Sequence, residues 1–180
     1  RSTPGFSGAD LENLVNEFSD FARMPKPILK DNDLIKILKE NIKLIKEIDK
    51  TIEIELLDND GVILLNCDKE QMGRVFFNLI KNSIESIQQK VEKNPNFDKK
   101  ISIEILKNYN HIKFTLIDNG IGFKSNKNNI NEILNPYYTT KKNGTGLGLS
   151  IVNKIINDHN GELLFHPLDN GAKIEINFKI

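Results

Sequence analysis

Apolar residues recur every three or four positions in four stretches of this chain. Residues at that spacing lie on one face of an α-helix, so each stretch predicts a helix with one buried side. Pro25 and Pro27 end the first stretch, because proline lacks the backbone donor that a helix needs, and Asp68 is a suitable N-cap for the third. The expected helices run over about residues 9–23, 32–48, 69–91 and 148–158.

In six shorter stretches apolar and polar residues alternate, or a brief apolar run stands alone, which predicts β-strands. Turn residues join these strands into three expected hairpins, which turn at residues 59–61, 108–110 and 169–171. Helices and strands do not alternate regularly, so the expected class is α+β: a two-layer α/β sandwich. Its mixed, mainly antiparallel sheet would have helices on one face and be preceded by a helix. The expected strands cover about residues 52–56, 62–65, 101–106, 112–117, 162–165 and 172–178.

Composition narrows the classes of ligand and fold. The 180 residues suffice for one domain, or for a domain with a short extension. The 25 basic and 25 acidic side chains cancel, so any charged ligand must be held by a local site. The single Cys67 excludes an intrachain disulfide framework. No apolar run approaches the roughly 20 residues of a membrane span.

Two asparagines lie four residues apart on one face of the third expected helix. Asn78 and Asn82 stand among apolar residues, although asparagine is a mediocre helix former. They form either a solvent-exposed polar face or a pair of neutral oxygen ligands. An amide oxygen suits a magnesium ion that phosphates already coordinate. The residues alone leave both explanations open.

Asp118 directly follows an expected apolar strand and begins the sequence Asp-Asn-Gly-Ile-Gly. Asn-Gly is a good turn dipeptide, and taken alone a turn is the better explanation. The functional alternative is a carboxylate that accepts a hydrogen bond from a base amine. Gly120 and Gly122 would then let the backbone approach a flat ligand closely.

Three alternating glycines, Gly144, Gly146 and Gly148, lead into the fourth expected helix. Backbone N–H groups at a helix N-terminus, together with the helix dipole, form an anion site. The pattern is neither a dinucleotide fingerprint nor a Walker loop, because no compact βαβ unit contains it and no Gly-Lys-Ser/Thr follows. Lys141 and Lys142 either add charge that faces a phosphate or belong to a solvated lid. The stretch from about 122 to 144 has little periodicity and predicts a long loop.

Together the order and spacing of these segments resemble the Bergerat-fold (GHKL) ATPases, which comprise histidine kinases, gyrase-type topoisomerases, MutL repair proteins and heat-shock chaperone ATPases. Residues 78–85 resemble the N box, 118–122 the first glycine box and 144–148 the second. Residues 135–141 resemble the F box of histidine kinases, with Tyr in place of the usual Phe. The resemblance covers about residues 33–180 and implies a Bergerat ATP-binding fold that uses ATP and Mg²⁺.

The resemblance also implies a role for particular residues. Asn82 would be the magnesium ligand, and Asp118 would bind the adenine amine. Leu147 would pack behind the lid, and Lys141 could reach the phosphates. The full nucleotide-binding set that it implies is Asn78, Asn82, Asp118, Gly120, Gly122, Lys141, Thr145, Gly146, Leu147 and Gly148.

Within this superfamily one position separates kinases from hydrolases. The hydrolysing branches resemble each other in placing a glutamate four residues before the magnesium asparagine, where it activates water. Asn78 holds that position here and cannot act as a base. This favours transfer of the γ-phosphoryl group to a protein histidine, by positioning and charge neutralisation. The alternatives are a gyrase- or MutL-like ATPase, and a non-catalytic dimerisation or interaction module with a relic pocket.

The phosphate-accepting histidine is not evident in the sequence. His111, His159 and His166 lack the Glu/Asp-x-x-Asn/Lys-Pro stretch of the family's acceptor segment, so each is expected to be an ordinary surface or packing residue and none is assigned as catalytic. Residues 13–25 resemble the second helix of the dimerisation and phosphoacceptor hairpin in NtrY-type nitrogen-regulation kinases. We therefore expect residues 1–27 to end that hairpin and residues 28–180 to form the ATP-binding catalytic domain. Alone, the chain would not autophosphorylate.

This resemblance implies a sensor histidine kinase of a two-component system. The expected partners are ATP, the phosphoacceptor hairpin of the parent kinase, a response regulator and, in the full-length protein, a second copy, but no nucleic acid. The domain would be cytoplasmic, in a membrane-anchored parent. A short stretch at residues 3–17 resembles the FtsH-type AAA proteases, but no AAA nucleotide motif accompanies it, and no function is assigned to it.

Overall fold

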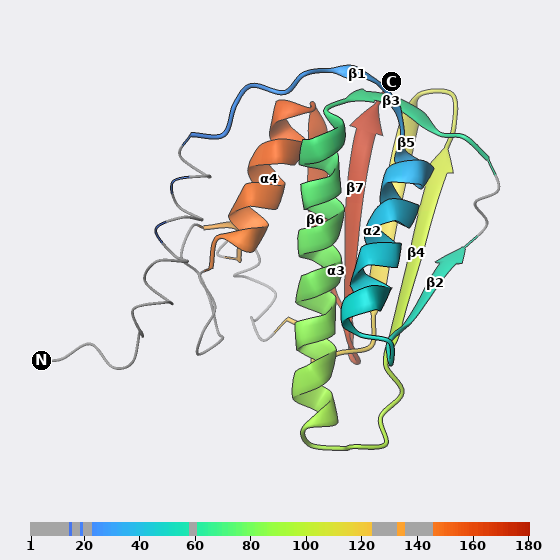
Figure 1. Ribbon diagram of the computed structural model, residues 1–180, viewed down its shortest axis with the longest axis vertical. Helices are drawn as coiled ribbons and strands as arrows, with labels where there is room; N and C mark the ends of the chain where they lie inside the picture. The colour runs from blue at the N-terminus through green and yellow to red at the C-terminus, as the bar shows by residue number, and fades with distance from the viewer. Residues whose placement is uncertain (1–14, 16–18, 20–22, 58–60, 124–132, 136–145) are drawn as a thin grey trace, which may run out of the picture.

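A computed structural model describes residues 15, 19, 23–57, 61–123, 133–135 and 146–180 of the chain (Figure 1). Its helices and strands form two layers, in the order β1, α2, β2, β3, α3, β4, β5, α4, β6 and β7. The helices are α2 (Leu34–Ile48), α3 (Lys69–Val91) and α4 (Gly148–Asp158). The strands are β1 (Lys30–Asp33), β2 (Glu53–Leu57), β3 (Leu64–Cys67), β4 (Lys100–Lys107), β5 (His111–Asp118), β6 (Gly161–Pro167) and β7 (Ala172–Lys179).

Five strands form the main sheet, in the order β2-β4-β5-β7-β6. Strand β2 runs parallel to β4, and the other three pairings are antiparallel. Figure 1 shows α2, α3 and α4 side by side in front of this sheet. The expected α+β sandwich, with a mixed and mainly antiparallel sheet, is therefore confirmed.

The core lies between the sheet and these helices. Every second residue of the central strands is buried there, as the two-residue period of a strand requires. Phe76 of α3 stacks on Phe114 of β5, with ring centroids 5.1 Å apart. Helix α3 is thereby held against the middle of the sheet. The buried strand residues are Ile101, Ile103 and Ile105 of β4, Ile112, Phe114 and Leu116 of β5, and Ile174, Ile176 and Phe178 of β7.

The expectation of a hairpin at residues 52–65 is wrong. Strand β2 pairs with β4 of the main sheet, and β3 pairs instead with β1 in a separate two-stranded sheet. Alternation of apolar residues determines which face of a strand is buried, but it does not determine which strand lies beside it. Strand β1 itself was not expected, because its sequence Lys-Asp-Asn-Asp has no apolar alternation and its pairing rests on the backbone.

The other two expected hairpins are confirmed as β4–β5 and β6–β7. The expected helix at 9–23 and the expected loop at 122–144 fall largely outside the described residues. In the described part of the chain, no helix is long and apolar enough to cross a membrane.

Asp68 joins three distant segments of the chain. Its carboxylate caps α3, accepting hydrogen bonds from the N–H groups of Glu70 and Gln71 at 3.0 Å each. The same carboxylate accepts a bond from the Ile28 N–H at 2.8 Å, and the Asp68 N–H donates to His159 Nε2 at 3.0 Å. Burial opposes ionisation of Asp68, but the backbone hydrogen bonds outweigh it, so its pKa lies below the ordinary value.

We expect Asp68→Ala to lower the free energy of unfolding by about 1–2 kcal/mol, because α3 loses its cap. Asp68→Asn, which keeps a capping oxygen, should lose less. Because the pKa of Asp68 is depressed by folding, its contribution is present above the ordinary carboxyl pKa and disappears as the pH falls through the folded-state value. Urea unfolding across pH measures both effects, with Asp169→Ala in an exposed turn as the control. Equal losses for Asp68→Ala and the control would contradict the capping role.

Candidate functional site

The candidate site is built around a buried carboxylate at the end of β5. Asp118 is only 4% exposed. Ser83, which is on α3 and also buried, donates its hydroxyl to Asp118 Oδ2 at 3.0 Å. The Gly120 N–H donates to Asp118 Oδ1 at 2.9 Å. Helix α3 and the loop after β5 thus fix both carboxylate oxygens in place.

Burial raises the pKa of Asp118 above its ordinary value. Hydrogen bonds from Gly120, Ser83 and Ala172 and the charge of Lys90 act in the opposite direction, but they do not cancel the loss of solvation. A carboxylate kept in such a place destabilises the fold unless it is paired. A buried acidic group with a raised pKa, set at a strand end, is typical of a functional site.

The two glycines of the Asp118 loop are required by contacts within the protein. A Cβ at Gly120 would overlap the Ser86 hydroxyl of α3, and the Ile121 N–H donates to that hydroxyl at 3.1 Å. Gly122 has a φ of +70°, and a Cβ there would lie 2.5 Å from the Gly171 carbonyl oxygen. The loop therefore packs tightly between α3 and the β6–β7 turn.

Lys90 holds the other side of this loop. Its Nζ donates to the carbonyl oxygens of Asn119 and Gly120, at 2.9 and 3.3 Å, and lies 4.4 Å from the centroid of the Phe97 ring. Asn119 is occupied structurally, since its side chain donates to the Asp98 carbonyl and accepts from the Lys100 N–H. In the loop, Asp118 is thus the acidic group left to meet a ligand.

The second end of the candidate site lies where α4 begins. Gly146 has a φ of +69°, which favours glycine, and the buried Leu147 is the N-cap of α4. Leucine has no polar side chain with which to cap the first N–H groups, and the first turn contains no acidic residue. These features leave a helix N-terminus suited to an anion.

The structure brings Asn78 and Asn82 to this same helix N-terminus. A Cβ built at Gly148 would lie 3.8 Å from Asn78 Oδ1 and 3.8 Å from Asn82 Nδ2. The first and third sequence segments therefore meet, although about 60 residues separate them. Lys141 and Thr145 of the implied nucleotide-binding set lie outside the described residues.

These residues fit a nucleotide with a metal ion. One end of the site offers a buried carboxylate that can accept a hydrogen bond, and the other offers two amide side chains beside a helix N-terminus. In the described part of the chain no three His, Cys, Asp or Glu residues gather as a metal cage. A cation at the amide end would accordingly need phosphate oxygens for much of its coordination, as magnesium commonly does.

Sequence reasoning missed four residues of this arrangement: Ser83, Ser86, Lys90 and Gly171. A Cβ at Gly171, whose φ is +104°, would overlap the Asp118 carbonyl oxygen. The one available signal was helical spacing, because Ser86 shares a face with Asn82. Nothing in the sequence indicates that Lys90 or Gly171 lies near Asp118.

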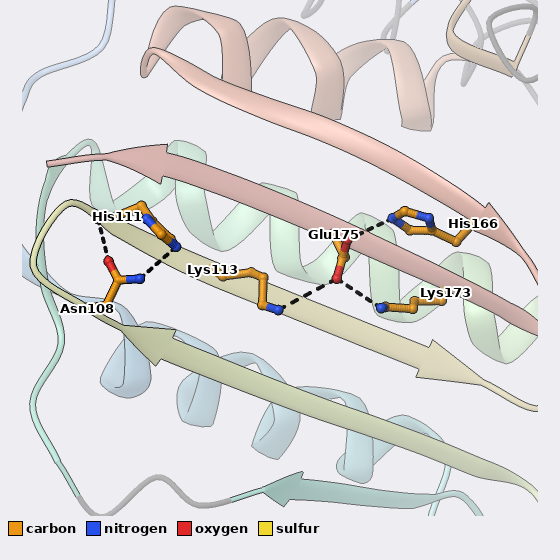
Figure 2. Close-up of polar contacts among 6 residues, drawn as sticks. All are labelled: Asn108, His111, Lys113, His166, Lys173 and Glu175. Atoms are coloured by element: carbon orange, nitrogen blue, oxygen red, sulfur yellow. Dashed lines mark hydrogen bonds and ion pairs between the residues drawn. The ribbon is translucent and has the colours of Figure 1, made fainter.

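Each of the three histidines makes a hydrogen bond within the chain. Figure 2 shows His166 Nε2 at 2.7 Å from Glu175 Oε2, and His111 Nε2 at 2.7 Å from the Asn108 side chain. Lys173 and Lys113 also approach Glu175, at 2.9 and 3.9 Å, and the hydrogen bond from Lys173 contributes most to lowering the pKa of Glu175. His159 is the buried partner of Asp68 described above.

Comparison with known proteins agrees with this geometry. A family model described as "Histidine kinase-, DNA gyrase B-, and HSP90-like ATPase" matches residues 67–180, which is more than half of the chain. The chain belongs to this ATPase family. Within the family it is homologous to sensor histidine kinases: the nitrogen regulation protein NtrY of Azorhizobium caulinodans is 31% identical over 172 residues. That match covers 94% of this chain but 22% of the relative, so the chain spans about a quarter of the length of the curated relatives it matches.

Solved structures of family members share the fold. Histidine kinase ThkA in complex with response regulator protein TrrA superposes with a TM-score of 0.75 and 23% identity, over 95% of this chain and 47% of that chain. Full-length ShkA in complex with AMPPNP superposes with a TM-score of 0.73 and 20% identity, over 93% of this chain and 35% of that chain. The ATP-binding fold that the sequence predicts is confirmed.

We expect Asp118→Asn to gain stability relative to the parent ATPase domain as the pH rises. The Asp118 pKa is higher in the folded state, so the folded protein binds the proton more tightly and loses stability as the pH rises from about 3.8 through the raised value. Asparagine does not titrate and removes this loss. Urea unfolding from about pH 4 to pH 7 measures the difference. Asp98→Asn, at an exposed position, is the control, and a pH-independent difference for Asp118→Asn would contradict the prediction.

Proposed function

We propose that the chain binds Mg-ATP and transfers the γ-phosphoryl group to a histidine on a phosphoacceptor hairpin of a two-component sensor kinase. One observation carries the proposal: helix α3 joins a buried carboxylate contact, Ser83 with Asp118, to the amides that face Gly148. An adenine amine at Asp118 and phosphates at the start of α4 would occupy these two ends. Family membership and homology to sensor kinases support the same reading.

In this proposal Asp118 accepts a hydrogen bond from the adenine amine and thereby selects the base. Ser83 and the Gly120 N–H orient the carboxylate, so it need not reorganise when the base enters. Gly122 shapes the same pocket by allowing the close approach of the β6–β7 turn. Specificity would come from a rigid acceptor, because a base without the amine would leave this buried oxygen unpaired.

At the other end Asn82 would be the magnesium ligand, and Asn78 and the N–H groups that begin α4 would face the phosphates. Bound magnesium supplies charge neutralisation at the phosphates, and the nucleotide supplies the phosphoryl group. Gly146 and Gly148 let the backbone turn into the helix, and Leu147 packs beneath it. Lys141 and Thr145 complete the proposed set by resemblance alone.

Asn78 also favours transfer over hydrolysis. A neutral amide accepts no proton from water, so the site lacks a base at the position where the hydrolysing branches of the family carry one. The chain would then contribute positioning and electrostatics, while the nucleophile comes from the partner hairpin. A gyrase- or MutL-like ATPase and a relic pocket are the competing functions.

The wider assembly follows from the relatives. Residues 1–27 would be the end of the phosphoacceptor hairpin and residues 28–180 the catalytic domain, within a parent that forms homodimers and is anchored at a membrane. A response regulator would receive the phosphoryl group, as the complex of ThkA with TrrA suggests for a neighbour of the same fold.

Nucleotide binding tests the site directly. We expect the chain to bind an ATP analogue only weakly without magnesium and more tightly with it, and Asp118→Asn to weaken binding at least about tenfold, because one charge-assisted hydrogen bond is lost. Calorimetry or fluorescence titration measures the affinity. Asp169→Asn, in an exposed turn, should bind like the parent. Unchanged affinity of Asp118→Asn would contradict the assignment of the adenine end.

Phosphoryl transfer tests the reaction. With labelled ATP, we expect no label on the chain alone and a label on a separately supplied histidine-bearing hairpin from an NtrY-type kinase. Loss of transfer in Asn82→Ala, with correct folding, would support its role at the phosphates. Label on His111, His159 or His166 of the isolated chain would overturn the external acceptor, and steady-state ATP turnover without a hairpin would favour the ATPase alternative.

A further inference from the structure

A groove runs between helix α2 and strand β2, at the edge of the sheet opposite β6. Its volume is about 510 Å³. The floor is apolar and is formed by Ile42 of α2 together with Ile54 and Leu56 of β2. None of these residues belongs to the candidate nucleotide site, so the ATPase fold alone does not account for the groove.

Lysines line the rim of this groove. Lys39, Lys43 and Lys46 lie on α2, and Lys50 follows shortly after its end. Spacings of four, three and four residues place them on one face. With Glu47, the lining has four basic side chains and one acidic one, a local charge of +3 on a chain whose net charge is zero.

Intrachain ion pairs do not use this charge. Among the residues that the structure describes, Lys43, Lys46 and Lys50 take part in no salt bridge, whereas the neighbouring Glu40 pairs with Lys69 on another side of α2 at 3.0 Å. All three lysines are exposed. The stripe is therefore available to an acidic partner.

The floor of the groove borders an open strand edge. Strand β2 ends the sheet order and pairs only with β4 among the described strands, as its place at the rim in Figure 1 shows. Such an edge presents backbone N–H and C=O groups that an extended segment of another chain can satisfy. A strand added there would lie beside α2 and beneath its lysines.

The spacing of the lysines suits a strand. Residues three or four apart on a helix are separated by about 4.5–6 Å along its axis. Alternate side chains on one face of a strand are about 6.6–6.8 Å apart. Acidic residues at every second position would thus run alongside successive lysines. The intervening side chains would point to the other face, where Glu53 and Glu55 lie, so neutral residues suit those positions.

Charge also separates the possible occupants. A second copy paired edge to edge would bring two lysine stripes together, which like-charge repulsion opposes. Single-stranded nucleic acid binds on aromatic platforms, and the lining contains no aromatic residue. We propose that this groove docks an acidic, extended segment of a partner protein, which adds a strand to the free edge of β2.

A designed peptide probes this proposal. The probe is a labelled ten-residue peptide in which glutamate alternates with threonine or valine. One matched peptide has lysine in place of glutamate, and another has the same composition with its glutamates contiguous. In fluorescence anisotropy without nucleotide, we expect binding of the alternating glutamate peptide alone, weakening as salt rises. Equal binding of both glutamate peptides would overturn the strand geometry.

Charge exchange on the protein provides the matched test. Lys43→Glu/Lys46→Glu should weaken binding of the glutamate peptide at least about tenfold and create binding of the lysine peptide. Lys93→Glu/Lys107→Glu, at exposed positions outside the groove, should change neither. Lys43→Gln/Lys46→Gln repeats the loss with good helix formers if the charge reversal unfolds the chain. Failure of both groove variants to alter binding overturns the proposal.

Two further arms separate other outcomes. Binding to vesicles that contain phosphatidylserine, without binding to the peptide, would replace the protein partner by an anionic membrane and overturn the proposal. The affinity for an ATP analogue should be the same in the parent and in Lys43→Glu/Lys46→Glu. Because the peptide assay contains no nucleotide, its failure would leave the proposed kinase function intact, and failure of nucleotide binding would leave the groove proposal intact.

Discussion

Both ends of the candidate site depend on the packing of one rigid helix, α3. Its residues Asn78 and Asn82 face the start of α4, while Ser83 and Ser86 contact the loop that follows β5. A helix rises 1.5 Å per residue, so the eight residues from Asn78 to Ser86 span about 12 Å. The stacking of Phe76 on Phe114 fixes this helix against the sheet. The separation of the two ends is therefore set by secondary structure, which a flexible loop could not do.

The same helix explains why a destabilising carboxylate is kept in the fold. Burial works against the charge of Asp118, yet Ser83, Gly120 and Lys90 all act to retain it. Such an arrangement gives up stability in exchange for an acceptor that is already oriented. The glycines beside it serve the same end, because they allow the loop to touch α3 and the β6–β7 turn.

Local physics made much of this predictable. Asp68 as a cap, α4 over residues 148–158 and the hairpins at β4–β5 and β6–β7 all follow from signals within a few residues of sequence. Pairing between distant strands carries no such signal, which is why β1 and the parallel pairing of β2 with β4 were missed. Asp118 and Asn82 stand out by residue type, whereas Lys90 acts through its position over a backbone that only the fold supplies.

The order of the strands has a consequence for the growing chain. Strand β7, residues 172–179, is inserted between β5 and β6, and Ala172 is the register partner of Asp118. During synthesis from the N-terminus, β5 emerges long before this neighbour exists, and loop closure over such distances is slow. A nascent chain that has just completed the Asp118 loop still lacks Gly171, the residue packed against its backbone. The adenine end of the pocket is thus assembled only when nearly all of these 180 residues have been made.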